Sequence, residues 1–402
     1  MSWKTVTLGE IIELQNGYAF KSSEYAEAGY FLMRITNVQQ GFIQNNNPKY
    51  VTIPESSKLK QFILNEGDIL MSLTGDVGRV GVLNESNLPA ALNQRVARVV
   101  IKSIRDLNKN YIFNLLNSEI IRNQIESLGH GAAQLNVSTK DILSIKVQLP
   151  SIATQQKIVA KLDAIFAEID TAKAAAEANA KNAEALFQSY VTEVFETEKY
   201  NFKLVKFGTT ASFVRGPFGG SLKKSIFVEK GYAVYEQQHA IYNQFSEIRY
   251  FIDESKFEEM KRFELKSGDL IMSCSGTMGK IAIVPKNIEP GVINQALLKI
   301  TPNTNIMGEY IARLLSSKYF QDILTKLSGG AAIQNVPAVS VLKDIKVPIP
   351  SIKNQKLIVD IIDVLESNKS IIKNSYKSKS KELANLKQSI LQQAFSGELV
   401  KD

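Results

Sequence analysis

The sequence predicts an α+β protein made of two similar globular halves, each followed by one long helix. Three observations support this fold class. The sequence repeats with a period of about 200 residues, and each globular half contains short β-branched runs separated by Gly, Asn and Pro. The third observation is a long segment without Gly or Pro that follows the first globular half. A chain of 402 residues with 44% hydrophobic content fills more than one core.

The repeat joins corresponding segments along the whole chain. The pairs are GDILMSLTGDVGRVGVL from Gly67 with GDLIMSCSGTMGKIAIV from Gly268, Asn93-Gln94 with Asn294-Gln295, GAAQLNV from Gly131 with GAAIQNV from Gly330, IKVQLPSIATQQKIV from Ile145 with IKVPIPSIKNQKLIV from Ile345, and LFQSYVTEVF from Leu186 with LKQSILQQAF from Leu386. We therefore expect globular domains at residues 1–150 and 199–350, with helical segments at 151–198 and 351–402.

Within each globular part the elements follow from local signals. The segment at Gly67 predicts strand, glycine-rich turn and strand, with Gly75 and Gly78 where a positive φ or a close backbone approach is needed. Apolar spacing predicts one helix over residues 111–128 and its copy over residues 310–327. The Asn-Gln pairs are interpreted as structural hydrogen-bonding residues.

The segment behind the first globular part predicts one long helix, because residues 151–207 contain neither Gly nor Pro. Ser151 and Ser351 are candidate N-caps. Apolar residues step by four and three alternately, the period of a coiled-coil seam, which Lys369 and Lys379 interrupt in the second copy. The seam residues are Ile158, Leu162, Ile165, Ile169 and Leu186 in the first helix and Ile358, Ile362, Leu365, Leu383, Leu386 and Ile390 in the second.

Charge favours pairing of the two helices. Residues 151–200 carry five basic and eight acidic side chains, and residues 351–402 carry nine basic and six acidic ones. A lone amphipathic helix of this length would also expose its seam to water.

Composition excludes several classes of protein. The single cysteine, Cys274, allows no intramolecular disulfide, and no window is apolar enough to cross a bilayer, so we expect a cytoplasmic protein without membrane contact. Neither histidine, His130 or His239, has a cluster of metal ligands at suitable spacing. The glycines from Gly75 lack the spacing of a nucleotide-binding loop. The net charge of +8 suits a polyanionic partner.

These duplicated motifs, each followed by a long helix, resemble the specificity subunits of type I restriction-modification enzymes over the whole chain. The glycine-centred strand pairs, IKVPIPSIKNQKLIV from Ile345 and the C-terminal LKQSILQQAFSGELV from Leu386 carry the resemblance. The central copy departs from it, since VTEVFETEKY stands where the second keeps AFSGEL.

The resemblance implies a pseudo-two-fold molecule in which an antiparallel pair of helices holds two target-recognition domains apart. Each domain would read half of a bipartite site in double-stranded DNA. Two methyltransferase subunits would dock on the chain and use S-adenosylmethionine to methylate adenine N6, and restriction subunits would join them. This chain would have no catalytic residue, metal or cofactor of its own.

Candidate DNA contacts follow from residue chemistry. Arg79 and Lys280 combine a cation with a glycine turn, which suits a phosphate contact, although a structural hairpin turn with a solvated cation is the favoured alternative. Arg, Asn and Gln can read guanine or adenine, so we expect base contacts among two segments that differ between the halves, against the alternative of polar strand ends. They contain Arg34 and Asn37 in the first half and Glu236, Gln237, Gln238 and His239 in the second.

Phosphate contacts are expected from Lys21, Arg215, Lys223 and Lys224, with a solvated surface as the alternative.

Two other functions are alternatives to a non-catalytic DNA-specificity adaptor. A self-contained methyltransferase or nuclease would need motifs that we do not find, such as Asn-Pro-Pro-Tyr. A coiled-coil adaptor for proteins alone would need no duplicated globular domains, and it predicts no affinity for duplex DNA.

Overall fold

The computed structural model describes residues 3–103, 105–129, 135–327 and 335–400. The chain forms two compact units, residues 1–176 with 378–402 and residues 177–377. We call them unit 1 and unit 2. His130 and most of the repeated segments from Gly131 and Gly330 lie outside the described residues.

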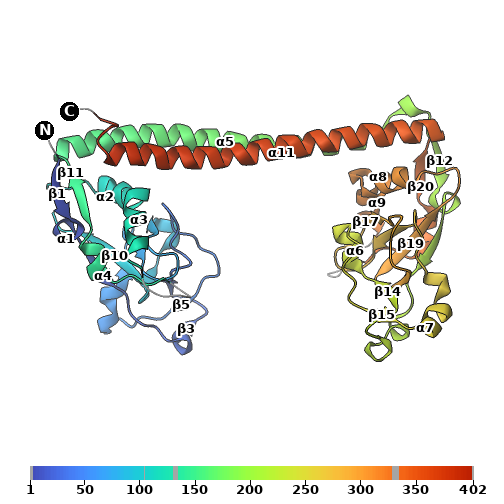
Figure 1. Cartoon of the computed structure of the whole chain (residues 1–402), viewed down its shortest axis with the longest axis horizontal. Coiled ribbons are helices and arrows are strands. Elements are labelled where there is room, and N and C mark those ends of the chain that lie inside the picture. The colour runs from blue at the N-terminus through green and yellow to red at the C-terminus, as the bar shows by residue number, and fades with distance from the viewer. Residues whose placement is uncertain (1–2, 104, 130–134, 328–334, 401–402) are drawn as a thin grey trace. The chain divides into compact units, whose positions relative to one another are not determined.

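Unit 1 contains a two-stranded, a four-stranded and a five-stranded sheet within its described residues (Figure 1). In their order across each sheet, the strands are β1 (Lys4–Thr7) and β11 (Lys146–Leu149); β2 (Ile12–Asn16), β10 (Val96–Ile101), β7 (Ile69–Ser72) and β8 (Val80–Val82); and β3 (Tyr25–Ala26), β5 (Tyr50–Val51), β4 (Tyr30–Met33), β9 (Ala90–Leu92) and β6 (Ile63–Leu64). Strands β4 and β9 run parallel.

Unit 2 repeats this topology with a smaller third sheet. Its strands are β12 (Lys203–Lys206) and β20 (Lys346–Ile349); β13 (Ala211–Arg215), β19 (Leu297–Pro302), β16 (Leu270–Ser273) and β17 (Ile281–Ile283); and β15 (Phe251–Ile252), β14 (Tyr232–Tyr235) and β18 (Gly291–Ile293). Strands β14 and β18 are again parallel. The α+β duplication expected from the sequence is confirmed.

The glycine-rich turn also forms as expected. Strands β7 and β8 pair antiparallel, and so do β16 and β17. Gly75 and Gly78 have φ angles of 80° and 75°, and Gly276 and Gly279 have 65° and 74°. An L side chain rarely adopts such angles, which explains why both copies have glycine there.

The prediction of a single helix over residues 111–128, and of its copy over residues 310–327, is wrong, because the chain forms two helices in each of these places. Unit 1 has α2 (Lys109–Leu116) and α3 (Glu119–Ser127), and unit 2 has α8 (Gly308–Ser316) and α9 (Lys318–Leu327). The other short helices are α1 (Leu8–Ile11), α4 (Thr139–Leu143), α6 (Gln237–Tyr242), α7 (Glu254–Glu259) and α10 (Val339–Asp344).

A buried serine accounts for both breaks. The hydroxyls of Ser118 and Ser317 donate to the carbonyls of Leu115 and Leu314, each over 2.6 Å. Such a local bond to the backbone competes with helix continuation, and Ser118 has the extended backbone of an N-cap, with φ −73° and ψ 148°.

The two long helices are α5 (Ile152–Glu196) and α11 (Ile352–Phe395). Ser151 caps the first, since its Oγ accepts a hydrogen bond from the amide of Thr154 over 3.3 Å. The helices pack on each other and run antiparallel. In unit 1, Lys161 donates to the carbonyl of Leu399, and Lys387 lies 3.8 Å from the carboxylate of Asp170. Residue numbers therefore increase in opposite directions along the two helices.

The expected seam is buried only over part of its length. Ile158, Leu162, Ile358 and Ile362 are at most 2% exposed. Ile169 is 6% exposed, and Ile165, Leu365, Leu383 and Ile390 are partly buried.

Leu186 and Leu386 differ from that expectation, with 58% and 46% of their surfaces exposed. The buried face near the end of α5 instead includes Val191 and Val194. A straight helix turns once in about 3.6 residues, so a strict 3.5-residue register drifts off the packed face over several turns.

The lysine that interrupts the seam at position 369 is accommodated by its neighbours. Its ammonium lies 4.1 Å from the centre of the Phe187 ring and 3.5 Å from the carboxylate of Glu184. Lys379 is exposed. A cation above an aromatic face is stabilised without leaving the partly buried seam.

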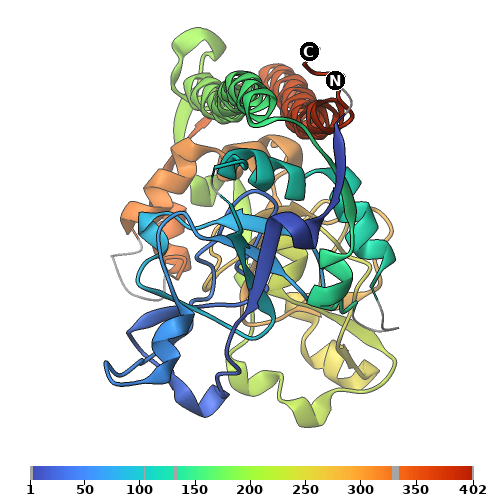
Figure 2. The same ribbon diagram turned by 90° about the vertical axis from the view of Figure 1, so that its left-hand side faces the viewer.

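Each core is completed by a segment distant in sequence. Leu391, Ala394, Phe395 and Leu399 of the C-terminal segment join the core of unit 1, where Phe395 packs edge-on against Tyr111 with ring centres 5.3 Å apart. Figure 2 shows the start of α5 and the end of α11 side by side above unit 1, close to both termini. In unit 2, Phe195 contacts Tyr310 in the same way, at 5.9 Å.

A buried glutamine anchors the start of each long helix. Gln155 is fully buried; its Oε1 accepts from the amide of Asn108 (2.9 Å), and its Nε2 donates to the carbonyls of Asp106 (3.1 Å) and Pro150 (3.0 Å). Gln355 makes the same three bonds in unit 2. In the described residues, no helix is long and apolar enough to cross a membrane.

Candidate nucleic-acid interface

Four loops of unit 1 meet where β4 and β9 end. Parallel strands bring their carboxyl ends to one edge, so the loop after β4 (residues 34–47) lies beside the turn after β9 (93–95). The turn after β2 joins them, because the amide of Gln94 donates to the carbonyl of Tyr18 over 2.9 Å. The amide of Leu73, at the β7–β8 turn, donates to the carbonyl of Arg95 over 3.1 Å. We call this surface the loop face.

Unit 2 builds an equivalent loop face. The amide of Asn294, after β18, donates to the carbonyl of Tyr235 at the end of β14 over 2.9 Å. The turn after β13 crosses so close that a Cβ on Gly216 would lie 1.8 Å from the carbonyl oxygen of Asn294. On Gly17 of unit 1 it would lie 2.3 Å from that of Asn93. The Asn-Gln pairs therefore mark a backbone crossing that only glycine permits.

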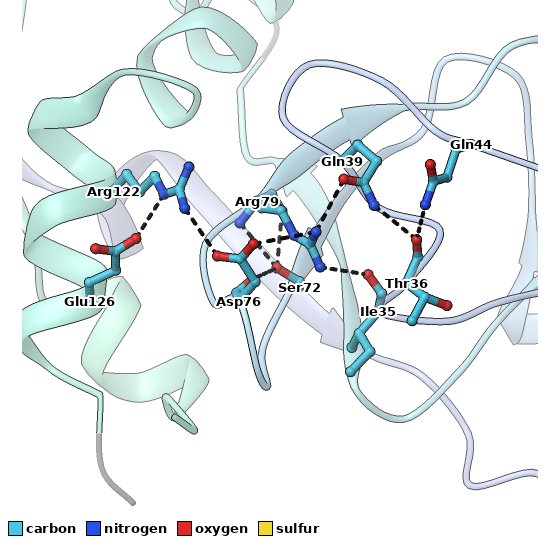
Figure 3. A network of polar contacts seen from close by, with 9 residues as sticks. All are labelled: Ile35, Thr36, Gln39, Gln44, Ser72, Asp76, Arg79, Arg122 and Glu126. Atoms are coloured by element: carbon cyan, nitrogen blue, oxygen red, sulfur yellow. Dashed lines mark hydrogen bonds and ion pairs between the residues drawn. The ribbon is translucent and has the colours of Figure 1, made fainter. Parts of the chain in front are cut away.

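Arg79 ties the loop face of unit 1 together (Figure 3). Its guanidinium donates to the side chain of Gln39 over 3.1 Å and to the carbonyl of Ile35 over 3.2 Å, and it lies 3.4 Å from the carboxylate of Asp76. Asp76 in turn accepts from Arg122 of α3 over 3.0 Å. With 16% of its side chain exposed, Arg79 positions the loop after β4.

Lys280 occupies the same turn in unit 2 but is exposed, and its ammonium has no polar partner among the described residues. The turn itself is built identically. Ser72 and Ser273 accept from the amides of Arg79 and Lys280 over 3.0 and 2.9 Å. The duplicated position therefore leaves a cation available in unit 2 and uses one internally in unit 1.

Asn37 is fully buried and shapes the loop after β4. Its Oδ1 accepts from the amide of Arg34 over 3.1 Å, and its Nδ2 donates to the carbonyls of Gln44 (3.1 Å) and Asn46 (3.3 Å). Arg34 donates to the carbonyl of Asn47 over 2.6 Å. In this conformation the amide of Asn37 has no atom free for a base.

His239 has the corresponding role in unit 2. It is fully buried; its Nδ1 lies 2.8 Å from the amide nitrogen of Glu236, and its Nε2 lies 3.2 Å from the carbonyl oxygen of Glu247. Gln237 accepts from the amide of Ser275 over 3.4 Å, so it bridges α6 to the β16–β17 turn. Gln238 is partly exposed.

The remaining expected cations are on or near the surface. Lys21, Lys223 and Lys224 are exposed, and Arg215 is partly buried. Two exposed side chains that were not among the expected contacts also lie on these loops: Phe218, which is 93% exposed, and Arg95, in the turn after β9.

The described residues offer no centre for covalent or metal chemistry. No three His, Cys, Asp or Glu residues among them are grouped to hold a metal ion. Burial raises the pKa of the Cys274 thiol to about 12, so it is not a ready nucleophile.

Comparison with known proteins identifies the family. The model of the type I restriction modification DNA specificity domain matches residues 1–179 and 218–379. The chain belongs to this specificity family. Its members are the non-catalytic specificity subunits of type I systems and carry no cofactor, since S-adenosylmethionine belongs to the methyltransferase subunit.

Several curated relatives are specificity subunits. The chain is 25% identical to the EcoBI specificity subunit of Escherichia coli over 99% of this chain and 86% of that one. It is 22% identical to the EcoKI specificity subunit of E. coli K12 over 99% and 89%. Identity to the MjaVIII specificity subunit of Methanocaldococcus jannaschii is 29%, over 50% of this chain and 48% of that one.

Solved structures share the specificity fold. A chain from work on complex assembly and conformational transition of the type I restriction-modification system aligns over 99% of this chain and 98% of its own, with 18% identity and a TM-score of 0.68. The HsdS subunit of Thermoanaerobacter tengcongensis aligns over 99% and 97%, with 18% identity and a TM-score of 0.57.

Proposed function

We propose that each unit reads one half of a bipartite double-stranded DNA target with its loop face, so that the chain gives a methyltransferase its sequence specificity. The observation that carries the proposal is that two loop faces share one backbone design but differ in their side chains. The loop after β4 has a partly exposed Arg34, where the segment after β14, which includes α6, has partly exposed Gln237 and Gln238. A backbone design shared by the two units, with different side chains, suits two different half-sites.

Phosphate contact is assigned to exposed cations. Lys21 in unit 1 and Lys223, Lys224 and Lys280 in unit 2 are exposed, and ammonium groups neutralise backbone phosphates without reading bases. Arg215 is a second-rank candidate, since it is partly buried.

Base contact is assigned to partly exposed polar side chains of the same loops, Arg34 in unit 1 and Gln237 and Gln238 in unit 2. Arg pairs with guanine and Gln with adenine in the major groove. Asn37 and His239, which are buried, and Arg79 act by holding the loops in place.

The long helices are proposed to set the spacer between half-sites and to dock two methyltransferase subunits that methylate adenine N6; restriction subunits complete the assembly. At about 1.5 Å rise per residue, the 45 residues of α5 form a rod of roughly 70 Å. Half-sites one helical turn apart on DNA are about 34 to 36 Å from each other, so a rod of this length suffices as a spacer.

Domain exchange tests the reading of half-sites. Residues 1–150 are replaced by those of another family member, while both long helices are kept, and methylated sequences are mapped in cells that also express the methyltransferase. One half of the target is expected to change. A matched exchange of residues 199–350 should change only the other half. A change in both halves from either exchange would show that the units do not read independently.

Helix insertion tests the spacer. Because α5 packs antiparallel to α11, four residues are added to both helices, after Ala180 and after Tyr376. Each insertion adds about 6 Å and nearly preserves helical phase, which corresponds to one or two base pairs of rise. Both half-sites should be retained with a spacer longer by one or two base pairs. Full activity on the original spacer would refute the proposed ruler.

A further inference from the structure

A groove of about 720 Å³ opens in unit 1 between the loop at residues 40–42, α2 and the parts of α5 and α11 in this unit. Part of its lining is apolar, and the Phe42 side chain there is 55% exposed. The apolar lining includes Phe42, Phe113, Phe166, Ile169, Leu383 and Leu391. Such a surface is costly to leave in water.

Three residues that line this groove each have a buried oxygen without a hydrogen-bond donor. These oxygens are Oε1 of Gln40, Oδ1 of Asn117 and Oε1 of Gln388, and none has a partner among the described residues. Asn117 is only 4% exposed. Its Nδ2 donates to the carbonyl of Phe113 over 3.0 Å, and Nε2 of Gln40 donates to the carbonyl of Asn117 over 2.8 Å. These bonds fix which end of each of the two amides is the acceptor.

Buried acceptors without donors are rare in native proteins, and each lost hydrogen bond costs stability. Three such oxygens, on residues that line one groove, therefore indicate that a donor-rich group binds there. Lys109, Lys173 and Lys387 also line the groove, but none of them donates to these oxygens, and Lys387 lies 3.8 Å from the carboxylate of Asp170. Asp163, at the same groove, is an exposed carboxylate with no ion pair among the described residues.

The second half of the chain shows which group fits. There, Arg313 of α8 donates to the carboxylates of Asp363 over 2.6 Å and Glu366 over 2.8 Å, both on α11. The repeat aligns Arg313 with Asn114 and these two acids with Asp163 and Phe166, which all line the groove of unit 1. The first half thus keeps one of the acids and lacks the arginine.

We infer that this groove binds an arginine side chain of the methyltransferase subunit, on a segment whose apolar residues cover Phe42 and Phe113. The inference rests on the proposed docking of that subunit. A guanidinium presents five N–H donors in a plane and is always charged, which matches three amide oxygens and the carboxylate of Asp163 better than an ammonium with three donors.

The two docking positions are then not equivalent. In unit 2 the corresponding position is filled by Arg313 from the chain itself, so a methyltransferase subunit there lacks this contact. One of the two subunits should be held by an arginine that the other leaves free.

The substitution Asn114→Arg tests this by giving unit 1 the residue of unit 2. The wild-type chain with the methyltransferase should give a complex with two methyltransferase subunits in native mass spectrometry. Asn114→Arg should block the groove, so that the complex retains one methyltransferase subunit and the affinity for the second falls at least about tenfold. Thr171→Arg adds the same charge on α5 at an exposed residue that does not line the groove, and it should keep two.

A second variant separates docking from folding. Gln388→Met removes a buried unpaired acceptor from α11, so the free chain should melt at the same or a higher temperature, while the complex weakens. If bound water already satisfies these oxygens, the variant should instead melt lower and bind both subunits normally, which would overturn the inference.

Arginine modification identifies the bound group directly. In the wild-type complex, one methyltransferase arginine should be protected from phenylglyoxal in one of the two copies, and Asn114→Arg should abolish the protection. Two subunits bound by Asn114→Arg with unchanged affinity, or no protected arginine, would overturn the inference. No methyltransferase bound by the wild-type chain would instead refute the docking in the proposed function.

Discussion

Replacing Gln155 by leucine should destabilise unit 1 without affecting unit 2. The change removes three buried hydrogen bonds of 2.9 to 3.1 Å and leaves the amide of Asn108 and two carbonyls without their partner. Each buried group left unpaired costs about 1 to 3 kcal/mol, and the added apolar burial returns about 1 to 2 kcal/mol. The expected loss is about 3 kcal/mol.

Hydrogen–deuterium exchange measures this loss unit by unit. A loss of about 3 kcal/mol should speed exchange of the protected amides in α2 and the first turns of α5 about a hundredfold. Gln156→Leu makes the same chemical change at the exposed neighbouring residue and should leave exchange unchanged. Equal effects of the two variants, or faster exchange in unit 2 from Gln155→Leu, would refute the anchoring role.

Three further outcomes are expected. Lys280→Ala should weaken DNA binding, reduce the salt dependence of the binding constant by about one counterion and leave Tm unchanged. Arg79→Ala should instead lower the free energy of unfolding by about 2 kcal/mol. DNA-binding titrations at several salt concentrations and thermal melts of both variants distinguish the two roles. Burial raises the pKa of Cys274 to about 12 from an ordinary value of 9.0. The neutral thiol therefore stabilises the fold fully below about pH 9, and this contribution to the free energy of unfolding should fall as the pH rises from about 9 to 12 and vanish in Cys274→Ala. The pure chain should transfer no methyl group from S-adenosylmethionine to DNA until methyltransferase is added; label incorporation by the chain alone would contradict this.

Features that depend on short-range pattern could be predicted from the sequence. The positive φ of Gly75 follows from glycine placement, and the existence of one long helix at α5 follows from a stretch without Gly and Pro. The end of α5 at Glu196 does not follow from it, since that stretch continues to residue 207. The strand pair at Gly67 was visible twice because the duplicated copy repeats it.

Features that depend on distant contacts could not be predicted. The break after α2 depends on the hydroxyl of Ser118 reaching a backbone carbonyl, which apolar spacing does not encode. Asn37 and His239 have the residue chemistry of base readers, yet both are fully buried, and their polar atoms bond to backbone groups of the surrounding chain. The anchoring role of Gln155 and Gln355 was not predicted, although the two residues occupy the same position in both copies of the repeat. Their side chains are neither apolar nor charged, so neither the core pattern nor the charge pattern singles them out.

The position of residues 378–402 within unit 1 constrains how recognition domains can be exchanged. Phe395 packs against Tyr111, and Leu391 and Leu399 join the same core, so a new domain grafted at residue 150 must present an aromatic or apolar surface to the retained end of α11. Removing a buried Phe or Leu contact costs about 2 to 5 kcal/mol, a large part of the stability of a typical domain. An exchange that fails to fold therefore reports a mismatch with the C-terminal segment, and adding residues 378–402 of the donor should restore it if this packing is the cause.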